Sequence, residues 1–439
     1  MYEKQERVFC IIIILAFVLS LGALGVVSLL DENPVISERE QRELNRFPQF
    51  SVSSLLDGSF MSQSQLAYDD TFPFRDYWLD VFGNFRSAVV VRAGSGGEVI
   101  VNVDDDPDEN IEVPEEDLIS LDDLLAEPFD GRGYEQFASG TEVSGIIIKD
   151  DRGMKIFNGT LEGAEAYTNA VKKIKSLFPN NNVIAVVAPN SSAFYSEEKY
   201  HTANHDQKAW LQLVRENLKG VIVPDVYSIL EEHKDEYIYF YTDHHWTTRG
   251  AYYAYRQMCT QLRILPYELE DMEEGRVSGF LGTFYTQTSS SILAKNPDYV
   301  YYYMPKVATE ATVYHNIRTL SDGESIKVIN QKYTGWNRYR LFTDGDNPFI
   351  IINTSASTNK TAILIKDSTG NAFVPWLCNH YSTIYVVDPR HVNGNNNNRI
   401  VLAEFLADKP NCDIILCSFI YNANNTSGSF YRGLLRMLK

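Results

Sequence analysis

Residues 361–372 have the sequence TAILIKDSTGNA, and this stretch decides the fold. It opens with an apolar run that is typical of a strand covered on both faces, and it turns polar at Asp367 and Ser368. Runs of similar character recur along the chain, and each predicts a strand. They lie at 144–150, 182–189, 220–224, 236–242, 382–388 and 412–419.

Helical patterns lie between several of these strands, near 161–178, 206–219, 247–264, 369–379 and 398–408. Strands that alternate with helices predict a parallel sheet with right-handed crossovers. We therefore expect an α/β fold, a three-layer α/β/α sandwich with a mostly parallel sheet, over residues 132–439. The stretch 266–360 breaks the rhythm, because it is Tyr-rich with short alternating runs. We expect it to be a β-rich insertion that carries part of a binding cleft.

Composition excludes several classes of protein. The 439 residues hold 39 Lys and Arg against 58 Asp and Glu, a net charge of -19, and so acidic a chain would repel nucleic acid. Hydrophobic residues make up 44% of the chain, enough for a buried core, which excludes wholesale disorder. The five Cys follow no metal-ligand spacing, so neither a zinc site nor a small disulfide-bonded fold is expected.

Much of the negative charge lies in one segment. Between Arg92 and Arg132 there is no Lys or Arg, but there are 14 Asp or Glu. Such a composition buries too little apolar surface to offset the entropy of ordering, so we expect a mobile acidic loop at 93–131. The spacing of its acidic residues departs from a calcium-binding EF-hand loop. No metal and no cofactor are therefore predicted.

The N-terminus carries a second distinct segment. Residues 8–30 contain 23 residues without a charge, and a helix of that length spans about 34 Å, enough for a bilayer core of about 30 Å. Basic residues precede it and acidic residues follow it, which favours a cytoplasmic tail at 1–7 and an extracytoplasmic domain after the anchor. The alternative, a cleaved signal peptide, has an apolar core of only about 7–15 residues. We therefore expect a single-pass protein of the cell membrane.

Two polar segments are candidates for chemistry. Residues 241–251, YTDHHWTTRGA, follow a predicted strand and open a predicted helix, and Asp243 is placed to fix the tautomer of His245. Ser368 begins a turn at the end of the strand 361–366, and Asn371 lies one helical turn further on. These residues suggest a Ser-His-Asp triad, but they leave two other interpretations open. One is a plain helix cap beside packed histidines, and the other is a Mn²⁺ phosphoesterase. The Gly-x-Ser-x-Gly elbow of α/β-hydrolases is absent.

The run Asp243-His244-His245-Trp246 resembles the signature of the bacterial DHHW protein family, which is similar to the SGNH-hydrolase-like proteins of alginate O-acetylation. Other segments fit the same family in the same order. They are Ser37-Glu38 with Glu40, Arg42, Leu44 and Phe47-Pro48, then Gly58, Phe60, Asp70 to Arg75, Pro189 to Tyr195, Thr247, Gly250, Ala251, Asp367-Ser368 and Asp388-Pro389-Arg390.

This resemblance implies an SGNH-like fold with an Asp243–His245–Ser368 triad. It also implies that residues 31–92 pack on the catalytic domain. The remaining candidates for contacting the substrate or its oxyanion are Asn371, Arg390, His244 and Trp246.

The activity implied is O-acyl transfer, most simply of acetyl, to a hydroxyl of a cell-surface glycan or exopolysaccharide. A multipass membrane O-acyltransferase would supply the acyl group, since acetyl-CoA is absent outside the cytoplasm. Two alternatives stay open: a carbohydrate esterase with the same triad, and a non-catalytic glycan-binding scaffold.

Overall fold

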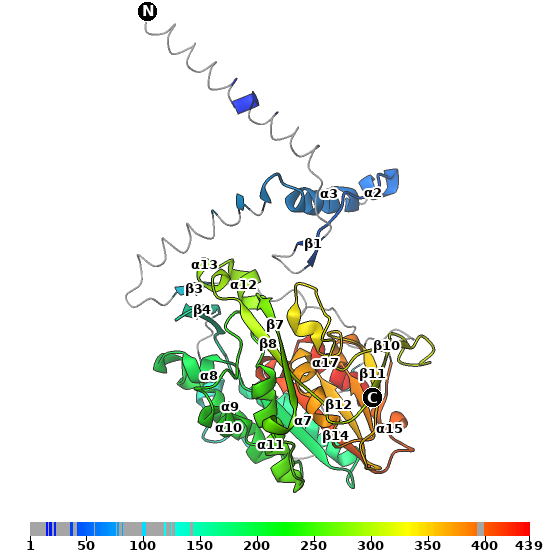
Figure 1. Cartoon of the computed structure of the whole chain (residues 1–439). Helices are drawn as coiled ribbons and strands as arrows, with labels where there is room; N and C mark the ends of the chain where they lie inside the picture. The colour runs from blue at the N-terminus through cyan, green and yellow to red at the C-terminus, as the bar shows by residue number, and fades with distance from the viewer. Residues whose placement is uncertain are drawn as a thin grey trace, which may run out of the picture. The chain divides into compact units, whose positions relative to one another are not determined.

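The structure is a computed structural model (Figure 1). It describes residues 15, 17–19, 22, 36–37, 42–56, 58–75, 77–78, 81, 99–101, 118–119, 124, 128–140, 144–392 and 399–439. The chain divides into two compact units. One is Met1–Val90 with Ser289–Ser291, and the other is Val91–Thr288 with Ile292–Lys439.

The larger unit is built on a seven-stranded sheet. Its strand order is β10 (Glu324–Ile326), β9 (Thr309–Tyr314), β11 (Phe349–Thr354), β13 (Thr383–Val387), β12 (Thr361–Lys366), β14 (Cys412–Phe419) and β6 (Val183–Ala188). The four strands β13, β12, β14 and β6 are parallel, and β11, β9 and β10 are antiparallel. The α/β class is confirmed, but the prediction of a mostly parallel sheet is wrong, because the sheet is mixed.

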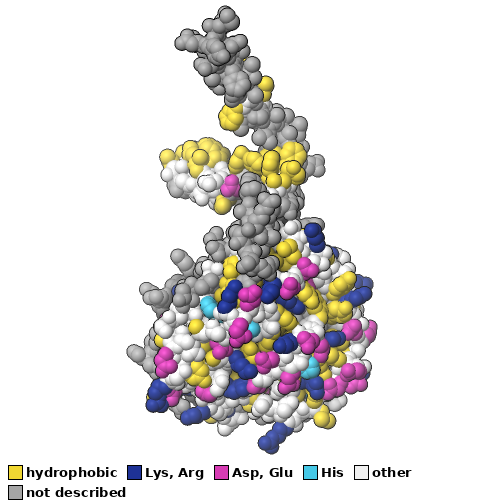
Figure 2. All heavy atoms as spheres, turned by 90° about the vertical axis from the view of Figure 1, so that its left-hand side faces the viewer, with side chains coloured by type: hydrophobic (Ala, Val, Ile, Leu, Met, Phe, Trp, Pro, Cys, Tyr) yellow, Lys and Arg dark blue, Asp and Glu magenta, His cyan; other side chains and the backbone are white. Residues whose placement is uncertain are grey.

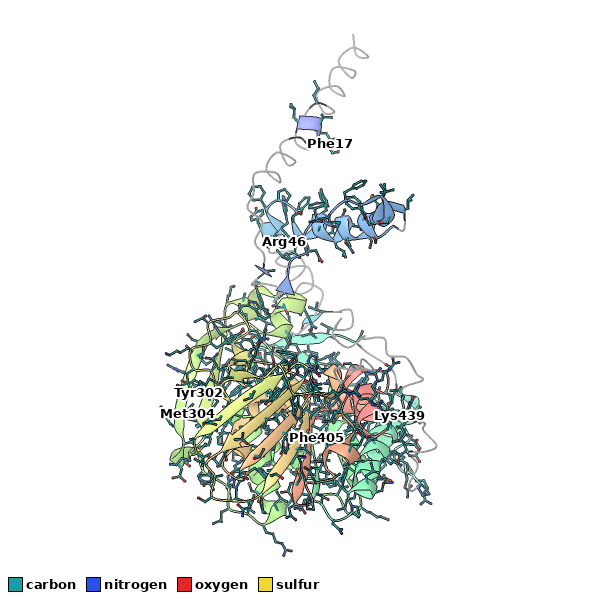
Figure 3. All side chains as sticks on the ribbon, turned by 90° about the vertical axis from the view of Figure 1, so that its right-hand side faces the viewer. Phe17, Arg46, Tyr302, Met304, Phe405 and Lys439 are labelled. Atoms are coloured by element: carbon teal, nitrogen blue, oxygen red, sulfur yellow. The ribbon has the colours of Figure 1, made fainter. Side chains whose placement is uncertain are left out.

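The antiparallel strands of the mixed sheet come from the predicted insertion, 266–360. Strand β11 carries the apolar run Phe349–Thr354 and pairs antiparallel with both β13 and β9. The insertion therefore extends the main sheet with its own strands instead of forming a separate β layer. Only its two-stranded ribbon, β7 (Glu273–Phe280) with β8 (Asp298–Met304), stands apart from the main sheet. Figure 3 labels Tyr302 and Met304 on β8.

Alternate residues of the central strands bury on opposite faces of the sheet. In β12, Ala362 and Leu364 pack with α10 (Val226–Glu232), α11 (Thr248–Leu262) and α14 (Val374–Leu377). Ile363 and Ile365 pack in a second cluster on the other face. The helices of that second cluster are α7 (Leu161–Leu177), α9 (Gln207–Asn217), α15 (Leu402–Phe405), α16 (Ile420–Asn424) and α17 (Ser429–Met437). Helices thus cover both faces (Figure 1).

Three predicted strands lie outside the main sheet. Residues 144–150 form β4 (Ile146–Lys149), which pairs antiparallel with β3 (Val99–Val101) and β5 (Arg152–Lys155) in a small sheet. The run 220–224 makes a single parallel bridge from Ile222 to β6. The run 236–242 folds back on residues 245–247 through a bridge between Tyr239 and Trp246, so the segment after it is a tight loop.

The three longest predicted helices are observed as α7, α9 and α11. The helices predicted at 369–379 and 398–408 are shorter, as η7 (Ser368–Ala372) with α14, and as α15. The remaining short elements are α6 (Gln136–Ser139), α8 (Ser192–Tyr195), η3 (Glu198–Tyr200), η4 (Ala203–His205), η5 (Leu269–Asp271), α12 (Thr283–Thr288), α13 (Ser291–Ala294), η6 (Arg338–Leu341) and η8 (Pro389–His391).

The smaller unit contains a two-residue ribbon, β1 (Ile36–Ser37) with β2 (Arg42–Glu43), and helices α2 (Val52–Leu56) and α3 (Ser59–Asp70). The buried Asp70 carboxylate accepts two hydrogen bonds from Asn45, at 2.7 and 2.8 Å. That residues 31–92 pack on the catalytic domain stays a prediction.

The predicted anchor, 8–30, lies almost wholly outside the described residues. No helix within the described part of the chain combines the length and the apolar character needed to cross a bilayer.

Most of the predicted acidic loop also lies outside the described residues. Within its described residues, β3 pairs with β4, the side chain of Leu124 is fully buried in the core, and the Asp130 N–H donates to Asn217 at 2.9 Å.

Candidate active site

The Asp-His-His segment lies in the loop 241–247, and a buried carboxylate holds the start of this loop. Asp298 accepts hydrogen bonds from the backbone N–H groups of Tyr241 (2.9 Å) and Thr242 (2.7 Å) and from the Thr242 hydroxyl (2.6 Å). Thr247 caps α11 and so ends the loop. Residues 243–246 are therefore fixed at both ends.

Asp243 and His245 form a buried pair. One carboxylate oxygen of Asp243 lies 2.6 Å from His245 Nδ1 and also accepts the His245 backbone N–H at 2.9 Å. The other oxygen accepts the Thr283 N–H at 2.8 Å. Gly282 permits this approach, because a Cβ there would lie 2.2 Å from the Asp243 Cβ.

The charges of this pair can be assigned. Burial opposes ionisation of Asp243, but the neighbouring histidines and the Thr283 N–H outweigh it and hold the pKa of Asp243 below its ordinary value. An ionised carboxylate can only accept, so His245 Nδ1 carries a proton, and in the neutral imidazole it is Nε2 that has the lone pair. Nε2 is buried and has no hydrogen-bond partner among the described residues.

His244 differs from its neighbour. Its Nδ1 lies 2.7 Å from the Thr283 hydroxyl, and its side chain is 21% exposed. Burial and the adjacent His245 lower the pKa of His244 to about 3. His244 is therefore neutral near pH 7, and its predicted role in contacting substrate stays a prediction.

Ser368 is half-buried at the start of η7, directly after β12. The buried Asp367 fixes this turn, because one of its oxygens accepts the Thr369 N–H at 2.9 Å and the other accepts the Phe419 N–H at 2.7 Å. The N–H groups of Thr369 and Gly370 both donate to Asp367, so neither of these two amides is free to hold an oxyanion.

Two aromatic residues bring the halves of the site together. The Tyr339 ring stacks on the His245 ring, with centroids 4.1 Å apart, and its hydroxyl donates to the Ser368 carbonyl at 2.9 Å. The Trp246 indole N–H donates to the Thr369 carbonyl at 2.9 Å. His245 and Ser368, far apart in the sequence, therefore lie at the same edge of the sheet, although no hydrogen bond joins Nε2 to the Ser368 hydroxyl.

Trp246 was predicted to face the substrate or its oxyanion, and this is wrong. Its side chain is only 1% exposed, it packs in the core, and its one polar hydrogen is bonded to Thr369. Its role is to fasten the loop 241–247 to the turn that carries Ser368.

A partly buried ion cluster lies beside Ser368: Lys366 and Asp388 are fully buried, whereas 35% of the Asp346 side chain is exposed. The Lys366 ammonium contacts Asp388 at 3.3 Å and Asp346 at 3.4 Å. Arg390 contacts the same two carboxylates, at 2.6 and 3.0 Å. Burial opposes ionisation of both acids, but the two cations outweigh it and hold the pKa of each carboxyl below its usual range. Two positive and two negative charges therefore balance within the cluster.

Two residues that were predicted to belong to the site also bind to this cluster. Asn371 donates from Nδ2 to Asp346 at 2.8 Å and is 1% exposed. Arg390 keeps 20% of its side chain exposed while bound to Asp388 and Asp346. Their predicted roles toward oxyanion and substrate stay predictions, since both side chains already serve Asp346.

The trio Asp243, His244 and His245 also has metal-ligand geometry, because their ligand atoms lie within 4.8 Å of one another. Within the described residues, however, the Asp243 oxygens and both Nδ1 atoms already have hydrogen-bond partners in the protein. A metal bound through either Nδ1 atom would have to displace these bonds, and the Asp243–Nδ1 hydrogen bond is the arrangement that orients a base.

Sequence reasoning missed Tyr339 and Asp346. Tyr339 lies in a short alternating run that predicts a strand but forms η6. Asp346 follows a turn in which Thr343, Asp344 and Gly345 all have positive φ, so its surroundings predict only a loop. Neither residue carries a local pattern that points to a site.

Comparison with known proteins places the chain among relatives. The pattern of the DHHW protein family matches residues 40–130 and 196–387, more than half of the chain. Among solved structures, a DHHW family protein from Eubacterium siraeum is 26% identical, with a TM-score of 0.56, over 67% of this chain and 96% of that one.

Two structures of Bacillus cereus PatB1 share the fold at lower identity. One is 18% identical with a TM-score of 0.52, over 65% of this chain and 99% of that one. The other carries a sulfonyl adduct and is 16% identical with a TM-score of 0.51, over 65% and 97% of the two chains. No curated protein matches the chain.

Proposed function

This chain belongs to the DHHW protein family, and we propose that it is an O-acyltransferase that moves an acyl group, most simply acetyl, to a glycan hydroxyl outside the cytoplasm. The observation that carries the proposal is the buried Asp243–His245 pair. Its free Nε2 lies at the sheet edge where Ser368 begins a turn. Such an imidazole has the tautomer and orientation of a general base.

In the first half-reaction, the Ser368 hydroxyl attacks the carbonyl carbon of the acyl donor while His245 Nε2 takes its proton. The tetrahedral intermediate collapses, the bond to the donor oxygen breaks, and His245 returns the proton to that oxygen. The product is an acyl ester of Ser368. Asp243 stabilises the imidazolium that forms in between.

In the second half-reaction, His245 deprotonates the glycan hydroxyl, whose oxygen attacks the acyl ester. The ester bond to Ser368 breaks, its oxygen takes the proton back from His245, and the acylated glycan leaves. With water in place of the glycan, the same steps give an esterase. An N-terminal membrane anchor at 8–30 and a multipass membrane acyl donor complete the proposal.

The relative with a sulfonyl adduct suggests a direct test. Sulfonylating reagents react with activated nucleophiles, so a sulfonyl fluoride should label one residue of the full-length protein. Peptide mass mapping should find the label on Ser368. Ser368→Ala should lose the label and should lower hydrolysis of p-nitrophenyl acetate by a factor on the order of 10⁶.

Three controls separate the alternatives. Ser418→Ala removes a hydroxyl that is fully buried next to the same sheet edge, and it should keep both label and rate. EDTA should leave the rate unchanged, whereas inactivation that Mn²⁺ reverses would favour a metal centre. In cells, deletion of the protein should lower glycan O-acetyl content, whereas a rise would favour the esterase. Unchanged activity in Ser368→Ala would rule out the covalent mechanism.

A further inference from the structure

A cleft with an aromatic wall is lined by both ends of the loop 241–247, which carries Asp243 and His245, and it is not used by the proposed mechanism. Its volume is about 850 Å³, near the upper end of the range of about 300–1,000 Å³ for ligand sites. Aromatic side chains and charged or amide side chains share its lining. The lining residues are Asp150, Asp151, Tyr237, Tyr241, Thr247, Arg249, Glu274, Lys295, Asn296, Pro297, Asp298, Tyr299 and Tyr301.

The cleft and the triad share one loop. Tyr241 and Thr247 line the cleft, while Asp243 and His245 lie between them in the chain. Asp298, which lines the cleft, accepts the backbone N–H groups that position this loop. One loop therefore carries both part of the cleft wall and the base, although Asp243, His245 and Ser368 do not themselves line the cleft.

The aromatic wall is held rigid before any ligand binds. Arg152 lies over the Tyr241 ring, with its guanidinium carbon 4.0 Å from the ring centroid, and Tyr237 stacks on Tyr241 at 5.8 Å. The Tyr237 hydroxyl is bonded to Asp298. Tyr299 is 43% exposed, and Arg276 lies over its ring at 4.8 Å. Rings fixed in this way offer apolar contact without loss of side-chain entropy.

Sugars fit such a surface. The C–H face of a pyranose packs on an aromatic ring, while its hydroxyls need donors and acceptors at the ring's edge. Asp150, Asp151 and Asn296 supply these groups beside the tyrosines. The tyrosine-rich strand β8 thus provides the type of surface that binds carbohydrate.

The charge of the lining narrows the class of sugar. Four carboxylates, Asp150, Asp151, Glu274 and Asp298, face two bases, Arg249 and Lys295. Arg249 is already paired, with Glu236 at 3.3 Å and with Glu274 at 3.9 Å. Two more bases, Arg152 and Arg276, lie over the rings of Tyr241 and Tyr299, so the charges around the cleft balance. A neutral sugar chain suits such a surface, whereas a chain of uronic acids meets no excess of positive charge there.

We propose that this cleft binds a neutral oligosaccharide stretch of the acceptor glycan and thereby presents its hydroxyl to the base at His245. The proposal rests on the proposed function for its biological sense, but its binding step needs neither acyl donor nor catalysis. Outside the shared loop 241–247, the cleft residues take no part in the triad's hydrogen bonds.

The test is direct binding of the full-length protein to an oligosaccharide array, followed by titration of the best ligands. The array should include β-linked glucose oligomers, N-acetylglucosamine oligomers and uronic acid oligomers, with no acyl donor present. We expect neutral oligomers to bind best. Tyr299→Ala should weaken binding by about tenfold or more, because it removes the exposed ring.

Two variants control for other causes. Tyr299→Phe keeps the ring and should bind within about twofold of the wild type, by the same stacking argument. Leu265→Ala removes a side chain that is 88% exposed and is not part of the cleft lining, and it should bind like the wild type.

The proposal is overturned if no oligosaccharide binds, if uronic acid oligomers bind as tightly as neutral ones, or if Tyr299→Ala binds like the wild type. These failures are distinct from a failure of the catalytic proposal. Loss of glycan binding would leave Ser368-dependent hydrolysis of a small ester intact. A chemically inert Ser368 would leave the binding result intact.

Discussion

Asp243→Asn is the sharpest test of the site, because it changes one atom in a fixed position. The carboxylate accepts three hydrogen bonds, two from His245 and one from Thr283. An amide keeps only one oxygen. If that oxygen faces Thr283, the new NH₂ group faces both His245 Nδ1 and the His245 backbone N–H. The backbone N–H then loses its acceptor, and the imidazole is forced into the other tautomer. Nε2 then carries a hydrogen and cannot accept the proton of Ser368.

The expected loss follows from this geometry. A base held in the wrong tautomer loses about 10⁴ in kcat, or about 5.4 kcal/mol at about 1.36 kcal/mol per factor of ten. If the oxygen instead faces His245, the NH₂ group meets the Thr283 N–H, and the unsatisfied donor costs about 1–3 kcal/mol of stability. Initial rates of p-nitrophenyl acetate hydrolysis and urea unfolding would measure the two effects separately.

Asp413→Asn is the matched control. Asp413 is also a buried carboxylate with hydrogen bonds, from Tyr381 and Asn182, but it lies at the start of β14, at the opposite end of the sheet. It should alter stability without altering the rate. A rate for Asp243→Asn within tenfold of the wild type, together with an unchanged free energy of unfolding, would refute the reasoning, since neither orientation of the amide would then have its expected cost.

Three further perturbations test how the site is held. Tyr339→Ala should lower kcat by about 100-fold, because His245 loses the ring that fixes its orientation. Tyr339→Phe keeps the ring stacked on His245 and should lower kcat by about tenfold or less. Equal losses of kcat in the two variants would exclude the stacking role. The free energy of unfolding should fall as the pH drops below about 6.5, because an unfolded histidine then binds a proton while native His244, with a pKa of about 3, does not. Urea unfolding at several pH values should show a smaller fall for His244→Gln than for the wild type. An identical fall in the two proteins would contradict the assignment of His244 as neutral. Asp298→Ala should cost about 3 kcal/mol or more of unfolding free energy, because it strands buried N–H groups; Asp322→Ala, whose exposed carboxylate accepts one N–H from Asn316, should cost less than about 1 kcal/mol in the same assay.

Local patterns predict the core of this fold well. The mainly apolar runs at 182–189, 361–366, 382–388 and 412–419 are the four parallel strands, because a strand covered on both faces is apolar at most of its positions. The run 236–242 has the same composition but forms no strand. Its Ile238, Tyr239 and Phe240 are fully buried all the same. A buried irregular segment and a buried strand have the same apolar composition, so composition alone cannot distinguish them.

Some features of the candidate site can likewise be predicted from local sequence, and others cannot. Asp243 and His245 are two residues apart, so their hydrogen bond is a local property that the sequence can suggest. The approach of His245 to Ser368 depends on how β12 and the loop 241–247 are placed by the whole sheet. That placement could be expected only from the resemblance to a family. The contacts of Tyr339 and Asp346 depend on tertiary structure alone.

The insertion at 266–360 therefore has a larger role than its irregular pattern suggests. Gly282 and Thr283 admit and bind Asp243, Asp298 holds the start of the catalytic loop, and Tyr339 covers His245. Asp346 ties Lys366 and Arg390 together beside Ser368. The strands of the central sheet supply the reacting groups, but the insertion supplies much of what orients them. Changes within it should thus alter the rate of the chemical step even where they touch neither donor nor glycan, because a base displaced by about 1 Å costs about 100-fold in rate.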